Sequence, residues 1–349
     1  SSQPMPQAVA VDAMGGDFAP EAVVQGSLLA ARDHGIRIVL VGPEDRLAPL
    51  LQGADADTRG RARIHHAPDT IGMADHPVDA IRRGRQSSLV QSIQLVKQDP
   101  DVGSAMSAGN SGAFMAGGKL ILGGIPGIFR PGFTIQLPSP RGPVVLLDAG
   151  AAVDCSAESL VQFGVMGHHY ARLILDRPEP KVALLNVGEE EGKGSQAVKE
   201  AYEYFRQAPV NFVGNIEGDR VFEGDADVIV CDGFAGNILL KTAEGVVQRL
   251  MHELKGALTA TPVRKLGAFL ARDAFRQIKQ GYDWEEMAGG VLLGVRGNLV
   301  VTHGKSGARG IMNSIRLAHR TAEFGLARTI AGALQETPGA QAAGAAAPE

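Results

Sequence analysis

The stretch VAVDAMGGD, residues 9–17, joins a short apolar run to a glycine-rich turn that carries two aspartates. Its apolar residues are contiguous rather than alternating with polar ones, as expected for a strand buried on both faces of a parallel sheet. The turn places Asp12, Gly15, Gly16 and Asp17 at the carboxyl end of this strand. In open α/β sheets, ligands bind outside the carboxyl ends of the strands. The stretch therefore predicts a buried strand and a ligand-binding loop together.

The same arrangement recurs along the chain and predicts the fold class. Seven apolar runs each lead into a loop where glycine stands beside Asp, Asn, Lys or His, and an eighth run covers 38–42. The seven runs are 9–12, 103–107, 144–148, 182–187, 211–214, 228–232 and 299–303. Helix-like segments lie between most of them, at 20–34, 76–98, 156–174, 195–207, 235–258 and 307–333. This alternation predicts an α/β fold, with a doubly wound, mostly parallel sheet sandwiched by helices.

Composition narrows the class of protein. The net charge of −4 argues against a nucleic-acid binder, and the two cysteines, Cys155 and Cys231, are typical of reduced thiols in a cytosolic protein. Glycine supplies 45 of the 349 residues, which indicates tight turns or close approach of backbone to a ligand. With no internal repeat and no clear linker, we expect one domain over residues 8–336, with disordered tails at 1–7 and 337–349.

The loops that follow the apolar runs hold most of the candidate substrate-binding residues. Each loop alone is explained about as well by turn formation, which also favours Gly, Asn and Asp, but seven such loops together favour a binding site. No spacing among the aspartates indicates a metal site, so we predict no metal ligand. The candidates from these loops are Asp12, Gly15, Gly16, Asp17, Ser107, Gly109, Asn110, Ser111, Gly112, Asp148, Asn186, Asn215, Asp232 and His303.

Motifs for nucleotide binding and for a serine nucleophile are absent. No GxGxxG follows a strand, and GNSGA (109–113) and GKSGA (304–308) do not match the GxSxG elbow. The segment LLNVGEEEGKGS (184–195) resembles a phosphate-binding loop but has three residues, all glutamates, where that motif has four. Ser111 and Ser306 stand where a helix begins, a position that suits anion binding or simple capping.

Three further side chains suit an anionic substrate. Pro131 forces an extended conformation on Arg130, which can then bind a phosphate or carboxylate through two hydrogen bonds. Asn237 opens a helix after DGFAG and can cap it or donate to a developing oxyanion. Lys241 lies one helical turn later on the same face.

Residues 262–280 have the pattern of an amphipathic helix within a protruding helical segment of about 246–284. Val263, Leu266, Phe269, Leu270 and Ile278 form an apolar stripe, and basic residues cover the rest of the surface. Such a stripe most often faces a core or an oligomer partner. A basic amphipathic helix with phenylalanine on its apolar side also suits an anionic membrane surface.

Taken together, six motifs resemble the PlsX family of acyl-acyl carrier protein:phosphate acyltransferases. They are AVDAMGGD, SAGNSGA, LLNVGEEEGKG, GNIEG, DGFAGNILLKTAEG and HGKSGARGIMNSI, in order over residues 8–333. The resemblance implies that inorganic phosphate attacks the thioester of an acylated carrier protein, giving an acyl phosphate for phospholipid synthesis without a cofactor. It also implies a fold similar to the isocitrate/isopropylmalate dehydrogenases and phosphate acetyltransferases. Further implications are a homodimer in the cytoplasm, peripheral contact with the inner face of the membrane, and a downstream membrane acyltransferase as partner.

With that reaction in view, Lys193 is expected to bind phosphate or neutralise the tetrahedral state, and Asn237 to donate to the oxyanion or hold the phosphate. Backbone amides around Gly15, Gly16, Gly109 and Gly112 would complete the cradle. Leu266, Phe269 and Leu270 are the expected membrane-facing residues. Departures from the family pattern are Ala152 for Asn, Ser111 for Thr, and Gly290-Val291 for Ala-Pro.

Three other functions are also compatible with these residues. The first is a short-chain phosphotransacylase that uses coenzyme A, and the second is a decarboxylating dehydrogenase on the related fold. The third is a non-catalytic regulator that binds the acyl carrier or a lipid. Turnover of acylated carrier protein with phosphate distinguishes all three from the expected reaction.

Overall fold

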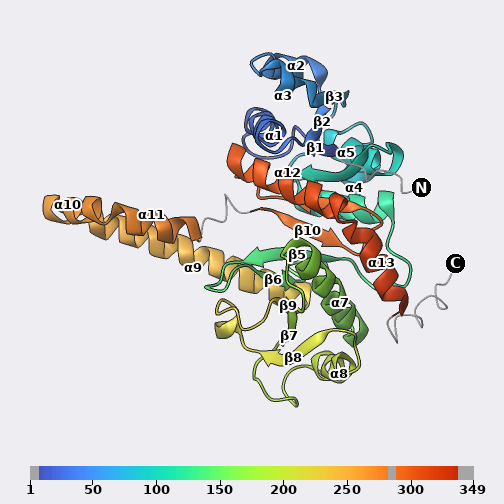
Figure 1. The fold of residues 1–349 in the computed structure, drawn as a ribbon, viewed down its shortest axis with the longest axis vertical. Coiled ribbons are helices and arrows are strands. Elements are labelled where there is room, and N and C mark those ends of the chain that lie inside the picture. The colour runs from blue at the N-terminus through green and yellow to red at the C-terminus, as the bar shows by residue number, and fades with distance from the viewer. Residues whose placement is uncertain (1–7, 282–287, 337–349) are drawn as a thin grey trace.

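The computed structural model describes residues 8–281 and 288–336, which form one sheet of eleven strands with helices on both faces (Figure 1). The strands are β1 Ala8–Asp12, β2 Arg37–Gly42, β3 Ala62–His66, β4 Val102–Ser107, β5 Gly132–Leu137, β6 Val144–Leu147, β7 Lys181–Leu185, β8 Asn211–Ile216, β9 Val228–Val230, β10 Gly290–Leu293 and β11 Asn298–Val301. The expected disordered tails, 1–7 and 337–349, lie outside the described residues.

Helices before β7 are α1 Glu21–His34, α2 Glu44–Leu51, α3 Ala56–Gly60, α4 Pro77–Arg83, α5 Ser88–Gln98, α6 Ser111–Gly117, the π-helical turn η1 Gly118–Leu122, and α7 Ala157–Ile174. Those after β7 are α8 Gln196–Phe205, the 3₁₀ turn η2 Gly218–Arg220, α9 Gly233–Thr259, α10 Pro262–Leu270, α11 Arg272–Gly281, α12 Ala308–Glu323 and α13 Leu326–Glu336. Two segments expected as single helices are each divided. Residues 76–98 divide near Gly84, and 307–333 divide at Gly325, whose φ of 62° ends the α-helical path.

The sheet has the strand order β3-β2-β1-β4-β11-β10-β5-β6-β9-β7-β8. Neighbours are parallel from β3 to β11 and again from β6 to β8, which confirms the mostly parallel sheet. The pairs β11–β10, β10–β5 and β5–β6 are antiparallel, so the two parallel blocks run in opposite directions. The sequence did not predict β3, β5 or β10, and therefore did not predict this reversal.

The two faces of the sheet are covered differently. On one face a single apolar cluster runs under α1, α12, α13, α7 and α8. On the other face the core is divided: one cluster lies under α5 and α6, and another joins β6 and β9 to the start of α9. Phe133 of β5 packs against both of these clusters. The division between them marks the place on the sheet where a cavity can open.

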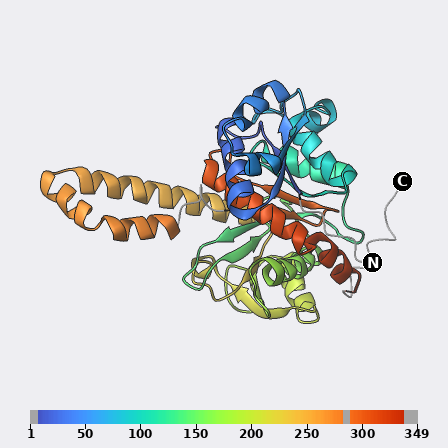
Figure 2. The same cartoon turned by 45° about the horizontal axis from the view of Figure 1, so that its top comes forward.

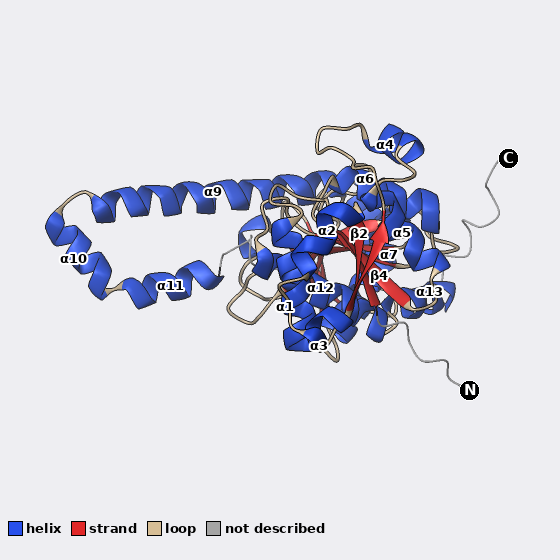
Figure 3. Ribbon diagram, turned by 90° about the horizontal axis from the view of Figure 1, so that it is seen from above, coloured by secondary structure: helices blue, strands red, loops and turns tan. Residues whose placement is uncertain are grey.

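Helices α9, α10 and α11 form an arm that projects from the body, with α10 and α11 folding back beside α9 (Figures 1, 2 and 3). The expected protruding segment is confirmed over its described residues. The expectation of one continuous helix over 262–280 was wrong, because the chain leaves the helical path at Ala271 (φ −91°, ψ 7°). No proline or glycine stands at the break, which is why periodicity did not show it. Among the described helices, none is both long and apolar enough to cross a bilayer.

Candidate active site

The loops after β1, β4 and β11 meet at one end of the first parallel block. The hydroxyl of Ser107 donates to Asp12 Oδ2 over 2.7 Å and accepts from Gly109 N over 3.0 Å. The backbones of Gly15 and Gly109 touch, since a Cβ on Gly15 would stand 2.7 Å from Gly109 N. Asp17 N donates to Gly304 O over 2.8 Å, which attaches the β11 loop. The structure thus brings together the predicted residues of three loops.

The buried residues of these three loops hold the loops to one another and do not face solvent. Asp12 and Ser107 are 2% and 1% exposed, and burial raises the pKa of Asp12 against the hydrogen bonds that it accepts. The amides of Gly15 and Gly109 donate to Asp12 O and Ser107 Oγ. Gly15 N and Gly109 N therefore already donate hydrogen bonds within the loops, as buried backbone groups generally do. They are not free to form part of the expected cradle of backbone amides.

Asn110 and Ser111 have different surroundings although they are neighbours. Asn110 is buried; its Oδ1 accepts from Ala113 N at the start of α6, and its Nδ2 lies within 3.3 Å of three carbonyls of the 72–75 loop. Its side-chain amide therefore bonds within the protein and positions α6. Ser111, one residue later, is exposed. A Cβ on Gly112 would meet Pro77 at 2.9 Å, so Gly112 allows α4 to approach.

The loop after β6 is built around the buried carboxylate of Asp148. Its oxygens accept from the backbone N–H groups of Phe133, Gly150, Ala151 and Ala152 at 2.6–3.0 Å. Burial raises the pKa of Asp148, and these four donors oppose the rise. Ala152 is buried; its carbonyl accepts from Gly233 N over 2.7 Å, which joins this loop to α9. The residue that replaces the family asparagine thus acts through its backbone.

The start of α9 is pressed against the Asp148 loop and carries Asn237. Asp232 caps the helix by accepting from Ala235 N over 2.7 Å. A Cβ on Gly236 would lie 1.8 Å from Asp148 O, so only glycine permits this approach. Asn237 is exposed and packs on Gly150, where a Cβ would stand 3.0 Å from its Nδ2. The side-chain amide of Asn237 therefore lies beside the Asp148 loop.

A third group of predicted residues forms the loop after β7. Asn186 Nδ2 donates to Lys193 O over 3.0 Å, and Asn215 Nδ2 donates to Glu190 O over 3.0 Å. Glu191 accepts from Tyr202 Oη over 3.3 Å, which turns one of the three glutamates toward α8. Lys193 is exposed, and its methylene chain folds over Gly188. Because β7 is the neighbour of β9 in the same parallel block, this loop lies on the same edge of the sheet as Asn237.

The loops after β4 and β11 meet the Asp148 loop and the start of α9 around a cavity of about 290 Å³, over the antiparallel centre of the sheet. Its exposed lining residues are polar: Ser111, Asn237, Lys241 and His303. The residues that line it and are buried are Ala149, Leu240, Gly289, Gly290, Val301 and Thr302. Met115, Phe133, Ile135, Gln136, Gly150, Glu244 and Ala288 are intermediate. The cavity therefore has a polar rim and a largely apolar interior, a combination typical of small-molecule sites.

Charges at this rim are nearly balanced. Lys241 donates to Glu244 Oε2 over 2.7 Å, and the glutamate side chain is only 12% exposed. His303 Nδ1 accepts from Lys305 N over 3.2 Å, which leaves Nε2 as the donor of the neutral ring. Lys193 does not line the cavity. Arg130 is exposed, and its positive charge acts to lower the pKa of the Cys155 thiol. The sequence missed Phe133 and Glu244, the first because β5 was not recognised.

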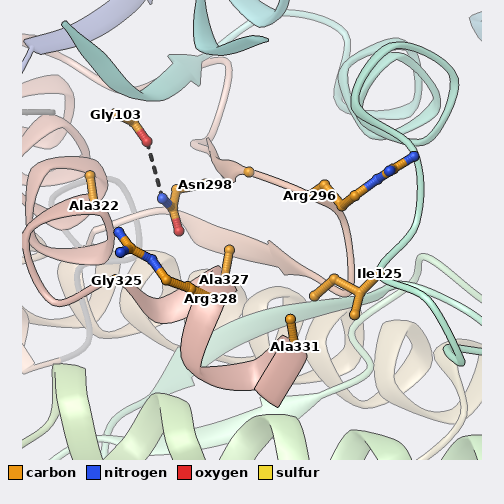
Figure 4. A pocket seen from close by; sticks show the side chains of 10 residues that line it. Gly103, Ile125, Arg296, Asn298, Ala322, Gly325, Ala327, Arg328 and Ala331 are labelled. Atoms are coloured by element: carbon orange, nitrogen blue, oxygen red, sulfur yellow. Dashed lines mark hydrogen bonds between the residues drawn. The ribbon is translucent and has the colours of Figure 1, made fainter. Parts of the chain in front are cut away.

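A second cavity of about 290 Å³ lies near the amino ends of β4 and β11, between α13 and the turn after η1 (Figure 4). It contains none of the predicted site residues. Asn298 donates to Gly103 O over 3.0 Å, and Arg296 lies against the turn at Gly123. Because ligand sites in such sheets form at carboxyl ends, we take the cavity near Asn237 as the candidate active site.

Neither cysteine is an available nucleophile. Burial and the nearby carboxylates of Asp148 and Asp232 raise the pKa of Cys155 to about 12, and burial raises the pKa of Cys231 well above its usual value. A thiol with so high a pKa stays protonated at neutral pH, whereas the thiolate is the reactive form. A covalent acyl-cysteine is therefore disfavoured. Among the described residues, no group of three His, Cys, Asp or Glu side chains could hold a metal ion.

Comparisons with known proteins agree with this geometry. Residues 7–329 match the family model described as "Fatty acid synthesis protein". A phosphate acyltransferase of Acidobacterium capsulatum is 44% identical over 318 residues, covering 91% of this chain and 94% of that protein. One of Pelotomaculum thermopropionicum is 43% identical over 327 residues, covering 94% and 95%.

Solved structures show the fold alone, at low sequence identity. The EutD phosphotransacetylase from Staphylococcus aureus has a TM-score of 0.60 and 16% identity, covering 90% of this chain and 94% of that chain. A 4-hydroxythreonine-4-phosphate dehydrogenase from Klebsiella pneumoniae has a TM-score of 0.52 and 14% identity, covering 90% and 99%. The expected fold similarity to phosphotransacetylases is confirmed.

An α/β sheet of this topology, together with relatives so similar over nearly the whole chain, defines an acyltransferase enzyme. The chain belongs to the fatty acid synthesis protein family, which is the PlsX family that the sequence motifs resemble.

Proposed function

We propose that the chain transfers a fatty acyl group from acyl carrier protein to inorganic phosphate and releases an acyl phosphate. The observation that carries this proposal is the cavity with a polar rim and an apolar interior. A thioester carbonyl placed at the rim would face Asn237, Lys241 and His303, while the alkyl chain entered the interior. The membership of the family, whose curated relatives are named phosphate acyltransferases, supports the same reaction.

The reaction requires positioning and electrostatic stabilisation but no protein nucleophile. A phosphate oxygen attacks the thioester carbonyl carbon, and the carbonyl oxygen gains negative charge. Collapse of the tetrahedral state breaks the carbon–sulfur bond, and the carrier thiolate leaves and takes up a proton. Asn237 places an amide donor at the rim, because the close approach of Gly236 to Asp148 O sets the adjacent backbone against the Asp148 loop. Preorganised donors of this kind stabilise the charge that develops in the transition state.

Lys193 is proposed as the cation that phosphate needs. The ammonium of Lys241 is already paired with Glu244, so this pair adds little net positive charge at the rim. Lys193 is exposed on the adjacent loop of the same sheet edge and is tied there through Asn186. We propose that its side chain turns from Gly188 toward Asn237 when phosphate binds. Ser111, which lines the rim, would contact the substrates, whereas Asp17 and Arg130 do not line the cavity.

The direct test measures release of carrier thiol from acylated carrier protein with and without phosphate. We expect phosphate-dependent release together with an acyl phosphate, which hydroxylamine traps as the hydroxamate. Preference for short acyl-coenzyme A would favour the short-chain phosphotransacylase instead. Tight binding of the acylated carrier without turnover would favour a non-catalytic regulator, and nicotinamide reduction with a 2-hydroxy acid would favour a dehydrogenase.

We propose further that the arm brings the enzyme, as a homodimer in the cytoplasm, to the inner face of the membrane. Leu266, Phe269 and Leu270 on α10 are 61%, 59% and 77% exposed, which is unusual for three large apolar side chains so close together. Arg264, Lys265 and Arg272 are exposed near them and suit anionic headgroups, although they also suit an acidic carrier protein. Delivery there would pass the poorly soluble acyl phosphate to a downstream membrane acyltransferase.

We expect the double variant Leu266→Glu/Phe269→Glu to float with anionic phospholipid vesicles at least roughly ten-fold less than the wild type. Each apolar side chain contributes about 1.5–3 kcal/mol when fully buried, so the loss of two exceeds one decade in partitioning. Val213→Glu, which places the same charge at an exposed position on β8, is the matched control. Unchanged flotation combined with loss of the dimer in ultracentrifugation would assign α10 to subunit contact.

A further inference from the structure

The interior of the active-site cavity depends on a glycine in β10. Gly290 pairs with Val301 of β11, and both residues line the cavity. Paired residues on neighbouring antiparallel strands point to the same face of a sheet. At position 290 that face carries no side chain, which leaves room beside Val301 for a side chain from β5.

The ring of Phe133 occupies this room. A Cβ on Gly290 would stand 2.4 Å from Phe133 Cζ and 1.9 Å from Thr134 O, so glycine permits the close approach of β5. Strands β10 and β5 pair at Leu292–Phe133 and Leu293–Gly132. Beyond those pairs, Thr134 Oγ1 accepts from Val291 N over 2.9 Å. The Phe133 ring thus lies where a side chain of residue 290 would otherwise be.

The order of exposure along the lining shows which end of the cavity would receive an alkyl chain. Asn237 and His303 at the rim are exposed, Met115, Phe133 and Ile135 are half-buried, and Leu240, Gly290 and Val301 are buried. Of the residues that line the cavity, the buried ones are apolar or glycine, except for Thr302. A chain that enters from the rim therefore ends against Gly290, Val301 and the ring of Phe133.

We propose that the Phe133 ring sets the length of acyl chain that the enzyme accepts. Gly290 leaves the place that the ring fills, and the ring closes the inner end of the cavity. This inference rests on the acyl transfer proposed above and adds its specificity determinant. The ligand is a fatty acyl chain, because the buried residues that line the cavity are apolar or glycine apart from Thr302.

The test compares kcat/KM for octanoyl, dodecanoyl and hexadecanoyl carrier protein in two variants that shorten the side chain at 133. We expect Phe133→Leu to raise the ratio of hexadecanoyl to octanoyl activity roughly ten-fold, since a change of one or two carbons in an apolar site has that effect. We expect Phe133→Ala to raise the same ratio further. Thermal unfolding establishes that each variant is folded; if Phe133→Ala is not, Phe133→Leu decides alone.

Val300→Ala is the matched control, because Val300 is buried in β11 but belongs to the cluster on the opposite face of the sheet. It should lower stability without changing the chain-length ratio. An unchanged ratio in a folded Phe133→Leu enzyme would overturn the inference while leaving acyl transfer intact.

A binding measurement separates the inference from the reaction. A fluorescent fatty acid bound to the wild-type enzyme is displaced by unlabelled fatty acids of increasing length. We expect Phe133→Leu to strengthen displacement by hexadecanoate more than by octanoate. If this shift occurs but phosphate never releases carrier thiol, the proposed reaction fails and the chain-length assignment stands. If neither the shift nor a change in activity ratio occurs, the assignment fails.

Discussion

Asn237→Ala is expected to lower the rate of phosphate-dependent thiol release by roughly 10²–10³, with a smaller effect on KM for the acylated carrier. The reason is that loss of one preorganised oxyanion donor costs about that factor in other acyl-transfer enzymes. Asn237 lines the cavity rim, and the close approach of Gly236 to Asp148 O fixes the backbone next to it. Steady-state kinetics at saturating phosphate measures the effect.

Gln248→Ala is the matched control for this substitution. Gln248 is an exposed amide on the same helix, three turns farther along the arm, so its removal tests whether truncation of any α9 amide disturbs the enzyme. Asn237→Asp adds a second comparison, because it keeps the size but replaces the donor by an acceptor with negative charge. We expect Asn237→Asp to be at least as inactive as Asn237→Ala. Activity within a few-fold of the wild type in both would remove Asn237 from the oxyanion site.

The fold could be predicted from the sequence where strands are buried on both faces, and not where they are short or interrupted. The runs at β1, β2 and β6 are wholly apolar or nearly so, and each was located to within a residue or two. Strand β5, GFTIQL, carries Thr134 and Gln136, whose hydrogen bonds to Val291 and Tyr170 cannot be foreseen from composition. Strand β10 begins with Gly290, and glycine is more typical of a loop than of a strand. These two strands form the antiparallel centre, so the opposite direction of the two parallel blocks was also missed.

The candidate site was predictable in its residues more than in their roles. Glycine-rich loops at strand ends marked the residues that surround the cavity, including His303 and Asn237. The same pattern also marked Asn110, Asn186 and Asn215, whose amides hold backbone carbonyls. A sequence shows that an Asn follows a strand, but the partner of its amide depends on which loops meet. Glu244 was missed for a similar reason, because its importance comes from pairing with Lys241 over the cavity.

The neutral Lys241–Glu244 pair leads to the second large prediction. Phosphate carries up to two negative charges at neutral pH, and a rim with one lysine already paired to a glutamate offers it little attraction. Lys193 is the cation that the adjacent loop presents, and its backbone is fixed by Asn186 while its side chain stays exposed. We expect Lys193→Ala to lower kcat/KM for phosphate by roughly 10²–10³, as for other charge-stabilising donors.

Three comparisons make this prediction specific. Lys199→Ala removes an equally exposed lysine from α8, directly after the same loop, and should leave kcat/KM for phosphate within a few-fold of the wild type. Lys193→Arg keeps the charge and should recover part of the loss. Lys241→Ala leaves Glu244 unpaired at the rim and should raise KM for phosphate through repulsion. If Lys193→Ala is active while Lys241→Ala is not, the phosphate is bound by Lys241, and the β7 loop serves only to shape the edge of the site.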